Sequence, residues 1–115
     1  MKFGISLQNR GPLATPENIV SVSQQAEIMG FYAVFVGDHI VIPDTVESRY
    51  PYSDTGSFTA GPSGEWLEQL SLLTFVAANT DRIYLVPSVM VLPLRNPIVV
   101  AKTLATIDVL SNGRL

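Results

Sequence analysis

The sequence contains no cysteine, and its only histidine is His39. Without cysteine, a disulfide scaffold, a thiolate nucleophile and any cysteine-ligated metal are excluded. One histidine does not supply the ligand set of an all-protein zinc site, so we expect no bound metal. Four common motifs are missing as well: the G-x-G-x-x-G dinucleotide fingerprint, the Gly-Lys-Ser/Thr phosphate loop, H-E-x-x-H and G-x-S-x-G.

Charge of either sign is scarce. Charged residues make up 15% of the chain, and seven Lys and Arg against ten Asp and Glu give a net charge of −3. A nucleic-acid-binding domain normally carries a basic patch, so we expect no nucleic-acid partner.

Long hydrophobic runs are also missing. The longest, residues 83–94, is interrupted by Pro87, Ser88 and Pro93, and it is well short of the roughly 20 residues that span a bilayer. The start of the chain turns polar at Gln8, too early for the apolar segment of a signal peptide. We therefore expect a cytoplasmic protein with no membrane partner.

Hydrophobic residues, in contrast, are abundant at 47% of the 115 residues. This composition forms a core and excludes disorder of the chain as a whole. The length is enough for one compact domain and too short for two, and no change in composition marks a linker. We therefore treat residues 1–115 as one domain.

The first third of the sequence predicts a strand, a helix and a second strand. Residues 3–7 and 31–36 are short apolar runs typical of strands. Between them Thr15 can cap a helix that has Pro16 in its first turn, and Gly30 ends that helix. A crossover of this length favours parallel strands.

The pattern then stops in a long loop at about residues 38–65, rich in Gly, Pro, Ser, Thr and Asp. A loop of this length in a compact domain is usually functional, and the alternative is a flexible insertion. Tyr50, Tyr52 and Phe58 favour a loop that packs against the rest of the domain.

The remainder predicts two more helices and a third strand. A helix carries Trp66 at helical spacing with later apolar residues, with Ser63 as its cap and the tryptophan in the core. A strand over residues 82–91 is interrupted at Pro87-Ser88. Asn96-Pro97 begins a last helix with an apolar face, and a fourth strand opens after it. The residues of these predictions are Leu70, Leu73 and Ala77 in the first helix, Val100, Leu104, Ile107 and Leu110 on the last, Ser111-Asn112-Gly113 at its end, and Arg114-Leu115 beyond.

This alternation predicts an α/β architecture with a parallel sheet, either an open doubly wound sheet or part of a (β/α) barrel. In both, ligands bind at the carboxyl ends of the strands, where Asp38 and His39 fall. His39 can exchange a proton near neutral pH. The alternative is that His39 only hydrogen-bonds the loop and Asp38 caps a turn.

Two further features follow the third predicted strand. Pro87 indicates a bulge or a strand end, and a bulge at Ser88-Val89 would aim backbone toward a ligand, whereas a simple kink is the alternative. Arg95 beside a helix start suits an anion, although a solvated side chain at an ordinary capped helix is the favoured interpretation.

An ordered set of short stretches runs the whole length of the chain. Its members are Met29-Gly30-Phe31, Gly37-Asp38-His39, Trp66-Leu67-Glu68, Leu72-Leu73, Val86-Pro87-Ser88-Val89, Leu92-Pro93-Leu94-Arg95-Asn96-Pro97, Ala101-Lys102-Thr103-Leu104-Ala105-Thr106 and Asp108-Val109-Leu110-Ser111-Asn112-Gly113-Arg114-Leu115. In this order they resemble the luciferase-like monooxygenases, and within them the oxidoreductases that use coenzyme F420, an 8-hydroxy-5-deazaflavin. The resemblance implies a (β/α)8 TIM barrel, of which residues 1–115 would be the N-terminal part, about the first three βα units.

The resemblance also implies roles for four residues. The Ser88-Val89 peptide, in many members a non-prolyl cis bond, would support the deazaflavin ring. Asp38 would hydrogen-bond the ring system, and His39 would act near its reactive carbon as proton donor or charge stabiliser. Some deazaflavin dehydrogenases have a tryptophan shortly after the histidine, where this chain has Ile42 and Pro43. That difference leaves the substrate open.

Three functions are therefore compatible with the sequence. The first is hydride transfer between coenzyme F420 and an unidentified small organic substrate. The second is an FMN-dependent monooxygenase reaction, with FMN as the alternative cofactor. The third is a non-catalytic barrel fragment that self-associates. We expect the complete protein to be an enzyme, and the 115-residue chain alone to be an inactive homo-oligomer, since unfilled barrel surface and unpaired strand edges recruit other chains.

Overall fold

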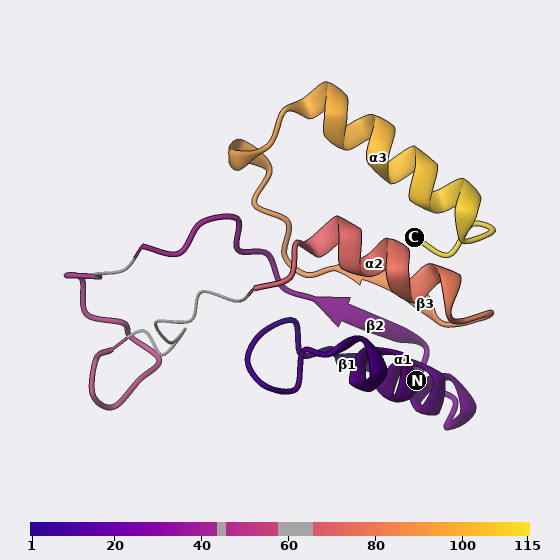
Figure 1. Ribbon diagram of the computed structural model, residues 1–115, viewed down its shortest axis with the longest axis horizontal. Coiled ribbons are helices and arrows are strands. Elements are labelled where there is room, and N and C mark those ends of the chain that lie inside the picture. The colour runs from indigo at the N-terminus through magenta and orange to yellow at the C-terminus, as the bar shows by residue number, and fades with distance from the viewer. Residues whose placement is uncertain (44–45, 58–65) are drawn as a thin grey trace.

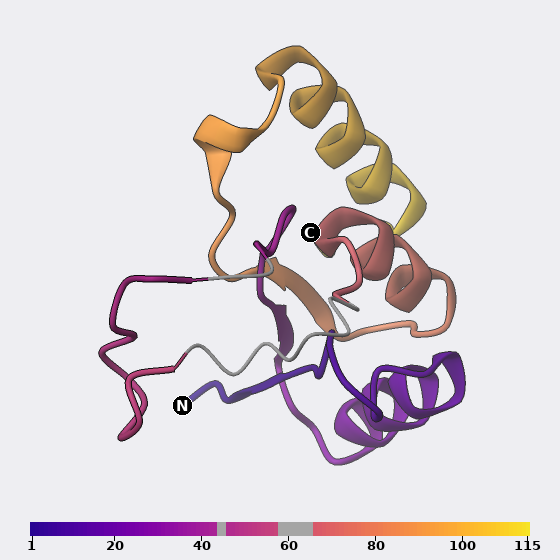
Figure 2. The same cartoon turned by 60° about the vertical axis from the view of Figure 1, so that its left-hand side comes forward.

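The computed structural model describes residues 1–43, 46–57 and 66–115. Its centre is a parallel sheet of three strands, β1 (Gly4–Ser6), β2 (Ala33–Val36) and β3 (Tyr84–Pro87), in the order β1-β2-β3. The helices α1 (Pro16–Ile28), α2 (Gln69–Ala78) and α3 (Pro97–Leu110) lie on one side of it (Figures 1 and 2). This arrangement confirms the predicted α/β class with parallel strands.

Helix α1 follows the sequence signals closely. The Thr15 hydroxyl accepts a hydrogen bond from the backbone N–H of Asn18, and Pro16 occupies the first turn. Ile19 and Ala26 are buried against the sheet. The helix ends at Ile28 with Met29 as its C-cap, and Gly30 follows with a φ of +82°, a left-handed conformation that glycine adopts at little cost.

Helix α2 begins later than the sequence indicates. Its N-cap is Glu68, whose carboxylate accepts a hydrogen bond of 2.7 Å from the N–H of Ser71. The predicted cap, Ser63, lies outside the described residues, as does Phe58. Trp66 is not part of the helix, so its helical spacing from Leu70 was misleading: Glu68 holds an extended backbone between them.

Strand β3 is shorter than predicted and ends at Pro87. Proline has no N–H for the next rung of the sheet, and the chain leaves the strand after it. Ser88 still donates its N–H to the carbonyl of Val36, at 2.8 Å. The residues that follow form a turn and then the short 3-10 helix η1 (Leu92–Leu94), which the sequence did not indicate.

Helix α3 begins at the predicted cap, Asn96, whose side chain accepts hydrogen bonds from two backbone N–H groups of the first turn. Val100 and Ile107 are buried as expected. Leu110, predicted on the same face, is 62% exposed, although Ile107 in the same turn is buried.

The chain turns back to the sheet after α3. Asn112 and Gly113 both adopt positive φ, as the predicted helix end requires. The N–H of Leu85 in β3 then donates to the carbonyl of Arg114 at 2.8 Å. The predicted fourth strand is not assigned, but this hydrogen bond brings residues 114–115 alongside β3.

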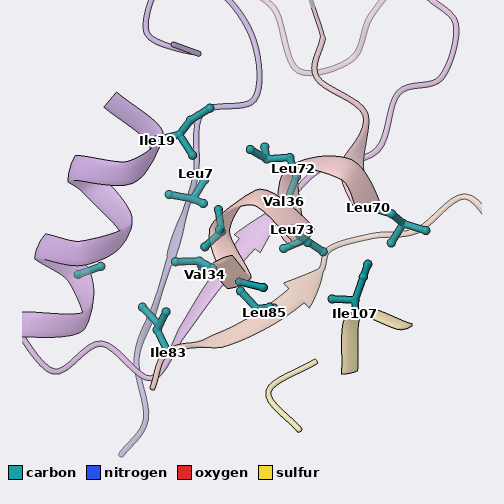
Figure 3. Close-up of a cluster of buried hydrophobic side chains, with 13 residues drawn as sticks. Leu7, Ile19, Val34, Val36, Leu70, Leu72, Leu73, Ile83, Leu85 and Ile107 are labelled. Atoms are coloured by element: carbon teal, nitrogen blue, oxygen red, sulfur yellow. The ribbon is translucent and has the colours of Figure 1, made fainter. Parts of the chain in front are cut away.

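The hydrophobic core fills the space between the sheet and the helices (Figure 3). Val34 and Val36 of β2 and Leu73 of α2 are fully buried at its centre. Burial of side chains of this size is the main favourable term in folding. Packing of these side chains therefore holds α2 against the face of the sheet.

The amino end of the sheet is held by two polar side chains. The Glu27 carboxylate accepts hydrogen bonds from the backbone N–H groups of residues 81, 82 and 83. Burial alone would raise the pKa of Glu27, but these hydrogen bonds bring it below its ordinary value. Arg114 donates to the carbonyls of Ala77, Thr80 and Ile83. Both side chains thereby close the turn between α2 and β3.

In the part of the chain that the structure describes, every helix is too short or too polar to cross a membrane.

We predict that the 115-residue chain self-associates in solution. Ile98 and Val109 of α3 are 80% and 75% exposed, and Phe3 beside β1 is also exposed. Exposed apolar patches and strand edges favour association. Sedimentation velocity should show species larger than the monomer, and Val109→Lys should reduce them if α3 forms the contact. A stable monomer at high protein concentration would contradict the prediction.

Candidate functional site

The carboxyl ends of the three strands gather the polar side chains that follow them. Asn9 comes after β1 and donates its side-chain amide to the carbonyl of Gly37, after β2, at 3.0 Å. The carbonyl of Asn9 in turn accepts a hydrogen bond from the N–H of Leu67, just before α2. These contacts bring three segments to one edge of the sheet, the edge at which parallel α/β folds bind ligands.

His39 lies in an aromatic and cationic cluster at this edge. Its imidazole packs on the indole of Trp66, with ring centres 3.9 Å apart and planes 35° apart. The guanidinium of Arg10 lies over the same indole, 4.6 Å from its centre. Arg10 and Trp66 also form an isolated antiparallel bridge. Trp66 therefore belongs to the candidate site and not to the core, which corrects the sequence prediction.

The cluster determines the charge of His39. Burial lowers the pKa of its imidazole, the positive charge of Arg10 lowers it further, and Asp38 opposes both. The imidazole is consequently neutral at neutral pH. A neutral imidazole carries one N–H donor and one acceptor nitrogen, so it can take up a proton as well as donate a hydrogen bond.

Asp38 is directed into the protein, and its side chain is only 1% exposed. Its carboxylate accepts a hydrogen bond of 2.9 Å from the N–H of Val91, and two more from the guanidinium of Arg95. The structure thus gives this carboxylate partners after β3. The contact with a cofactor ring that the family resemblance implies stays a prediction.

Arg95 is neither a solvated side chain nor an open anion site, so both interpretations of its sequence position were wrong. Its guanidinium forms ion pairs of 2.8 Å with Asp38 and with Glu68, and the side chain is largely buried. The hydrogen bond to Asp38 raises the pKa of Arg95 above its ordinary value. For Glu68, burial acts to raise the pKa, but hydrogen bonds from the first turn of α2 and from Arg95 lower it.

The segment after β3 presents Val89 to the surface. The peptide bond between Ser88 and Val89 is cis, as predicted, and it follows the strand end instead of forming a bulge within the strand. The Val89 side chain is 74% exposed. Its carbonyl accepts a hydrogen bond from Gln69, whose amide also donates to the carbonyl of Val36. The contact of Ser88 and Val89 with a cofactor stays a prediction.

A pocket of about 320 Å³ opens beside His39 within the long loop. Most of its lining is apolar, with a few polar side chains at its walls; the residues are Val41, Ile42, Pro43, Val46, Ser48, Arg49, Tyr50 and Pro51. Tyr50 packs edge-on against Tyr52, although Tyr52 itself is exposed, contrary to the expectation of a packed ring. This pocket suits a small, mainly apolar molecule next to the imidazole.

Sequence reasoning missed Arg10, Trp66, Glu68 and Gln69 as members of this edge. Trp66 and Glu68 lie in a stretch that carries the family resemblance, but it was given no role in the site, and three of the four residues precede or begin a helix that was placed too early. Arg10, after β1, meets Trp66, before α2, through an isolated antiparallel bridge, and no sequence pattern reports that contact. Among the described residues, no group of three or more His, Cys, Asp or Glu side chains could hold a metal ion.

The sequence matches the family described as luciferase-like monooxygenase over residues 1–115, and the chain belongs to this family. It is 30% identical over 115 residues to the uncharacterized protein Rv0953c of Mycobacterium tuberculosis, covering all of this chain and 40% of that protein. A second uncharacterized protein of the same organism, Rv0940c, is 27% identical over 96 residues, which cover 84% of this chain and 33% of that protein. The chain thus spans about two fifths or less of the length of these relatives.

Two solved structures share the fold. The coenzyme F420 dependent tetrahydromethanopterin reductase from Methanopyrus kandleri aligns with a TM-score of 0.69 and 25% identity over 98% of this chain and 25% of its own. The monooxygenase RslO1 from Streptomyces bottropensis aligns with a TM-score of 0.69 and 24% identity over 100% of this chain and 31% of its own. The fold is therefore part of a luciferase-like TIM barrel.

We predict that Trp66, the only tryptophan, reports the protonation of His39. A protonated imidazole quenches a stacked indole, so Trp66 fluorescence should fall as the pH is lowered, with a midpoint below 6.5, the ordinary pKa of histidine. His39→Gln should abolish the transition, and Arg10→Gln should raise its midpoint by removing the neighbouring charge. A midpoint above 6.5, or a transition that persists in His39→Gln, would contradict this assignment.

Proposed function

We propose that this chain provides the cofactor-facing edge of a coenzyme F420-dependent oxidoreductase that transfers hydride between the coenzyme and a small organic substrate. One observation supports the proposal most: the hydrogen bond from Val91 to Asp38 joins the His39 loop to the segment carrying Val89, at the carboxyl edge of the sheet. The similarity to the reductase from Methanopyrus kandleri supports the choice of coenzyme.

The residues at this edge fit the planar ring system of such a coenzyme, which carries polar groups along its edges. Val89 offers an exposed apolar surface, and Gly37 has open space where a side chain would stand, so backbone is accessible beside it. The buried indole N–H of Trp66 has no acceptor among the described residues, which leaves a donor for a ligand. An apolar face with a few placed donors is the usual chemistry of a cofactor site.

The chain's own residues would orient the coenzyme and handle the proton. Coenzyme F420 supplies hydride chemistry when it is bound. The neutral imidazole of His39 can accept or return the proton that accompanies hydride transfer, and Trp66 and Arg10 hold that ring in place. The apolar pocket beside His39 would bind the substrate and exclude water from it.

An FMN-dependent monooxygenase is the second candidate, and the description of the family favours it. The likeness of fold does not favour one candidate over the other, since the reductase and the monooxygenase align with the same TM-score of 0.69. Because the chain spans about two fifths of Rv0953c, we propose that the 115-residue chain by itself is inactive.

The choice of coenzyme is tested by titrating the purified product of this protein's own gene with F420 and with FMN. We expect the change in coenzyme absorbance on binding to saturate with F420 at a lower concentration than with FMN. The 115-residue chain should bind either one weakly. Tighter binding of FMN, with oxygen consumption when its reduced form is supplied, would favour the monooxygenase. Binding of neither would exclude both coenzyme-dependent functions.

The role of His39 is tested by His39→Ala in the same gene product. Loss of an acid–base group lowers turnover by roughly 10²–10⁴-fold, and we expect a change of this size. Coenzyme affinity and melting temperature should change far less, since the core and the 88–91 segment stay intact. Steady-state kinetics with coenzyme titration separate these effects. Unchanged turnover in a folded His39→Ala protein would exclude the proposed role.

A further inference from the structure

The backbone of residues 88–91 is anchored by side chains from other elements, and on two sides. From one side, Asp38 accepts the N–H of Val91 at 2.9 Å. From the other, Gln69 at the start of α2 donates to the carbonyl of Val89 at 3.3 Å and to that of Val36 at 2.7 Å. The segment is therefore tied both to the end of β2 and to the first turn of α2.

Arg95 completes the arrangement by holding Asp38. Its guanidinium meets Asp38 through two nitrogens, at 2.8 Å and 3.3 Å, and a third nitrogen meets Glu68 at 2.8 Å. A two-point contact of this kind fixes the orientation of a carboxylate as well as its charge. Glu68 is the N-cap of α2, so the same guanidinium also links the segment to that helix.

These groups are too buried to act on a ligand directly. Gln69 is fully buried, and the side chains of Asp38 and Arg95 are 1% and 11% exposed. A buried carboxylate without its partners would be costly, so the position of Asp38 depends on Arg95 and on the N–H of Val91. These groups can act on a ligand through the backbone segment that they hold, which presents the exposed side chain of Val89.

We propose that Asp38, Arg95 and Gln69 are positioning residues. They hold the backbone of residues 88–91 in the position that binds the coenzyme, and they thereby set the affinity for the coenzyme. This inference rests on the proposed function and deepens it. It also gives Asp38 a different role from a contact with the ring: the carboxylate acts through the backbone of Val91. Hydrogen bonds to charged groups are strong enough for their loss to weaken binding by roughly 10- to 100-fold.

The experiment uses Asp38→Asn, Arg95→Gln and Gln69→Leu in the product of the gene. Two quantities are measured: amide hydrogen exchange of residues 88–91 without ligand, and the dissociation constant for F420 and for FMN. We expect faster exchange and weaker binding in all three variants. The double variant of Asp38 and Arg95 should be little worse than either single one, since the two residues act as a unit. Arg95→Lys keeps the charge without the two-point contact and should rescue binding only in part.

Glu27→Gln is the matched control, because Glu27 is also a carboxylate that accepts backbone N–H groups, but at the opposite end of the sheet. It should lower the melting temperature without changing the dissociation constant or the exchange of residues 88–91. A loss of coenzyme affinity in Glu27→Gln equal to that in Asp38→Asn would mean that general destabilisation explains both, and would overturn the inference.

The remaining outcomes separate this inference from the proposed function. Tight coenzyme binding by the wild type that all three variants retain overturns the inference alone. Faster exchange with unchanged binding overturns it as well, since the segment would then not set affinity. If the wild type binds neither F420 nor FMN, the proposed function is overturned. The inference about coenzyme affinity is then overturned as well, whatever hydrogen exchange shows about the anchoring of residues 88–91.

Discussion

A buried carboxylate needs a partner for each of its oxygens, and this requirement at Asp38 organises the candidate site. Asp38 stands directly after β2, and its partners, Val91 and Arg95, come from the chain after β3. Arg95 is in turn paired with Glu68 at the start of α2. One charged group therefore connects three separate segments, and the loop that carries His39 and the surface that carries Val89 take their places from it.

Much of the fold could be read from the sequence because its signals are local. Caps and prolines at Thr15, Pro16 and Asn96 determined where two helices begin, and the structure agrees. The errors arose where a non-local contact prevailed over a local pattern. Trp66 has helical spacing from Leu70, yet it pairs with Arg10 and packs on His39, and the helix is capped by Glu68 instead of the predicted Ser63.

The candidate site could be predicted only in part, for the same physical reason. The position of Asp38 and His39 follows from the rule that parallel strands present their carboxyl ends at one edge, which needs no knowledge of contacts. The partners of these residues depend on how three loops meet. The separation of Asp38 from Arg95 by 57 positions left no local pattern, and Arg95 was accordingly taken for a solvated side chain.

The two ends of the sheet differ in how completely the polar groups of the described residues are hydrogen-bonded within the protein. At the amino end, the Glu27 carboxylate accepts consecutive backbone N–H groups and Arg114 covers the carbonyls at the end of α2, so the polar groups there are used within the protein. At the carboxyl end, the buried indole N–H of Trp66 and the carbonyl oxygen of the Gln69 side chain have no partner among the described residues, and apolar Val89 is exposed. Unsatisfied buried polar groups are costly in a fold that has no use for them. Their occurrence at the edge that carries His39 is consistent with the proposed placement of a ligand at this end, where Trp66 and Val89 rather than the fully buried Gln69 would face it.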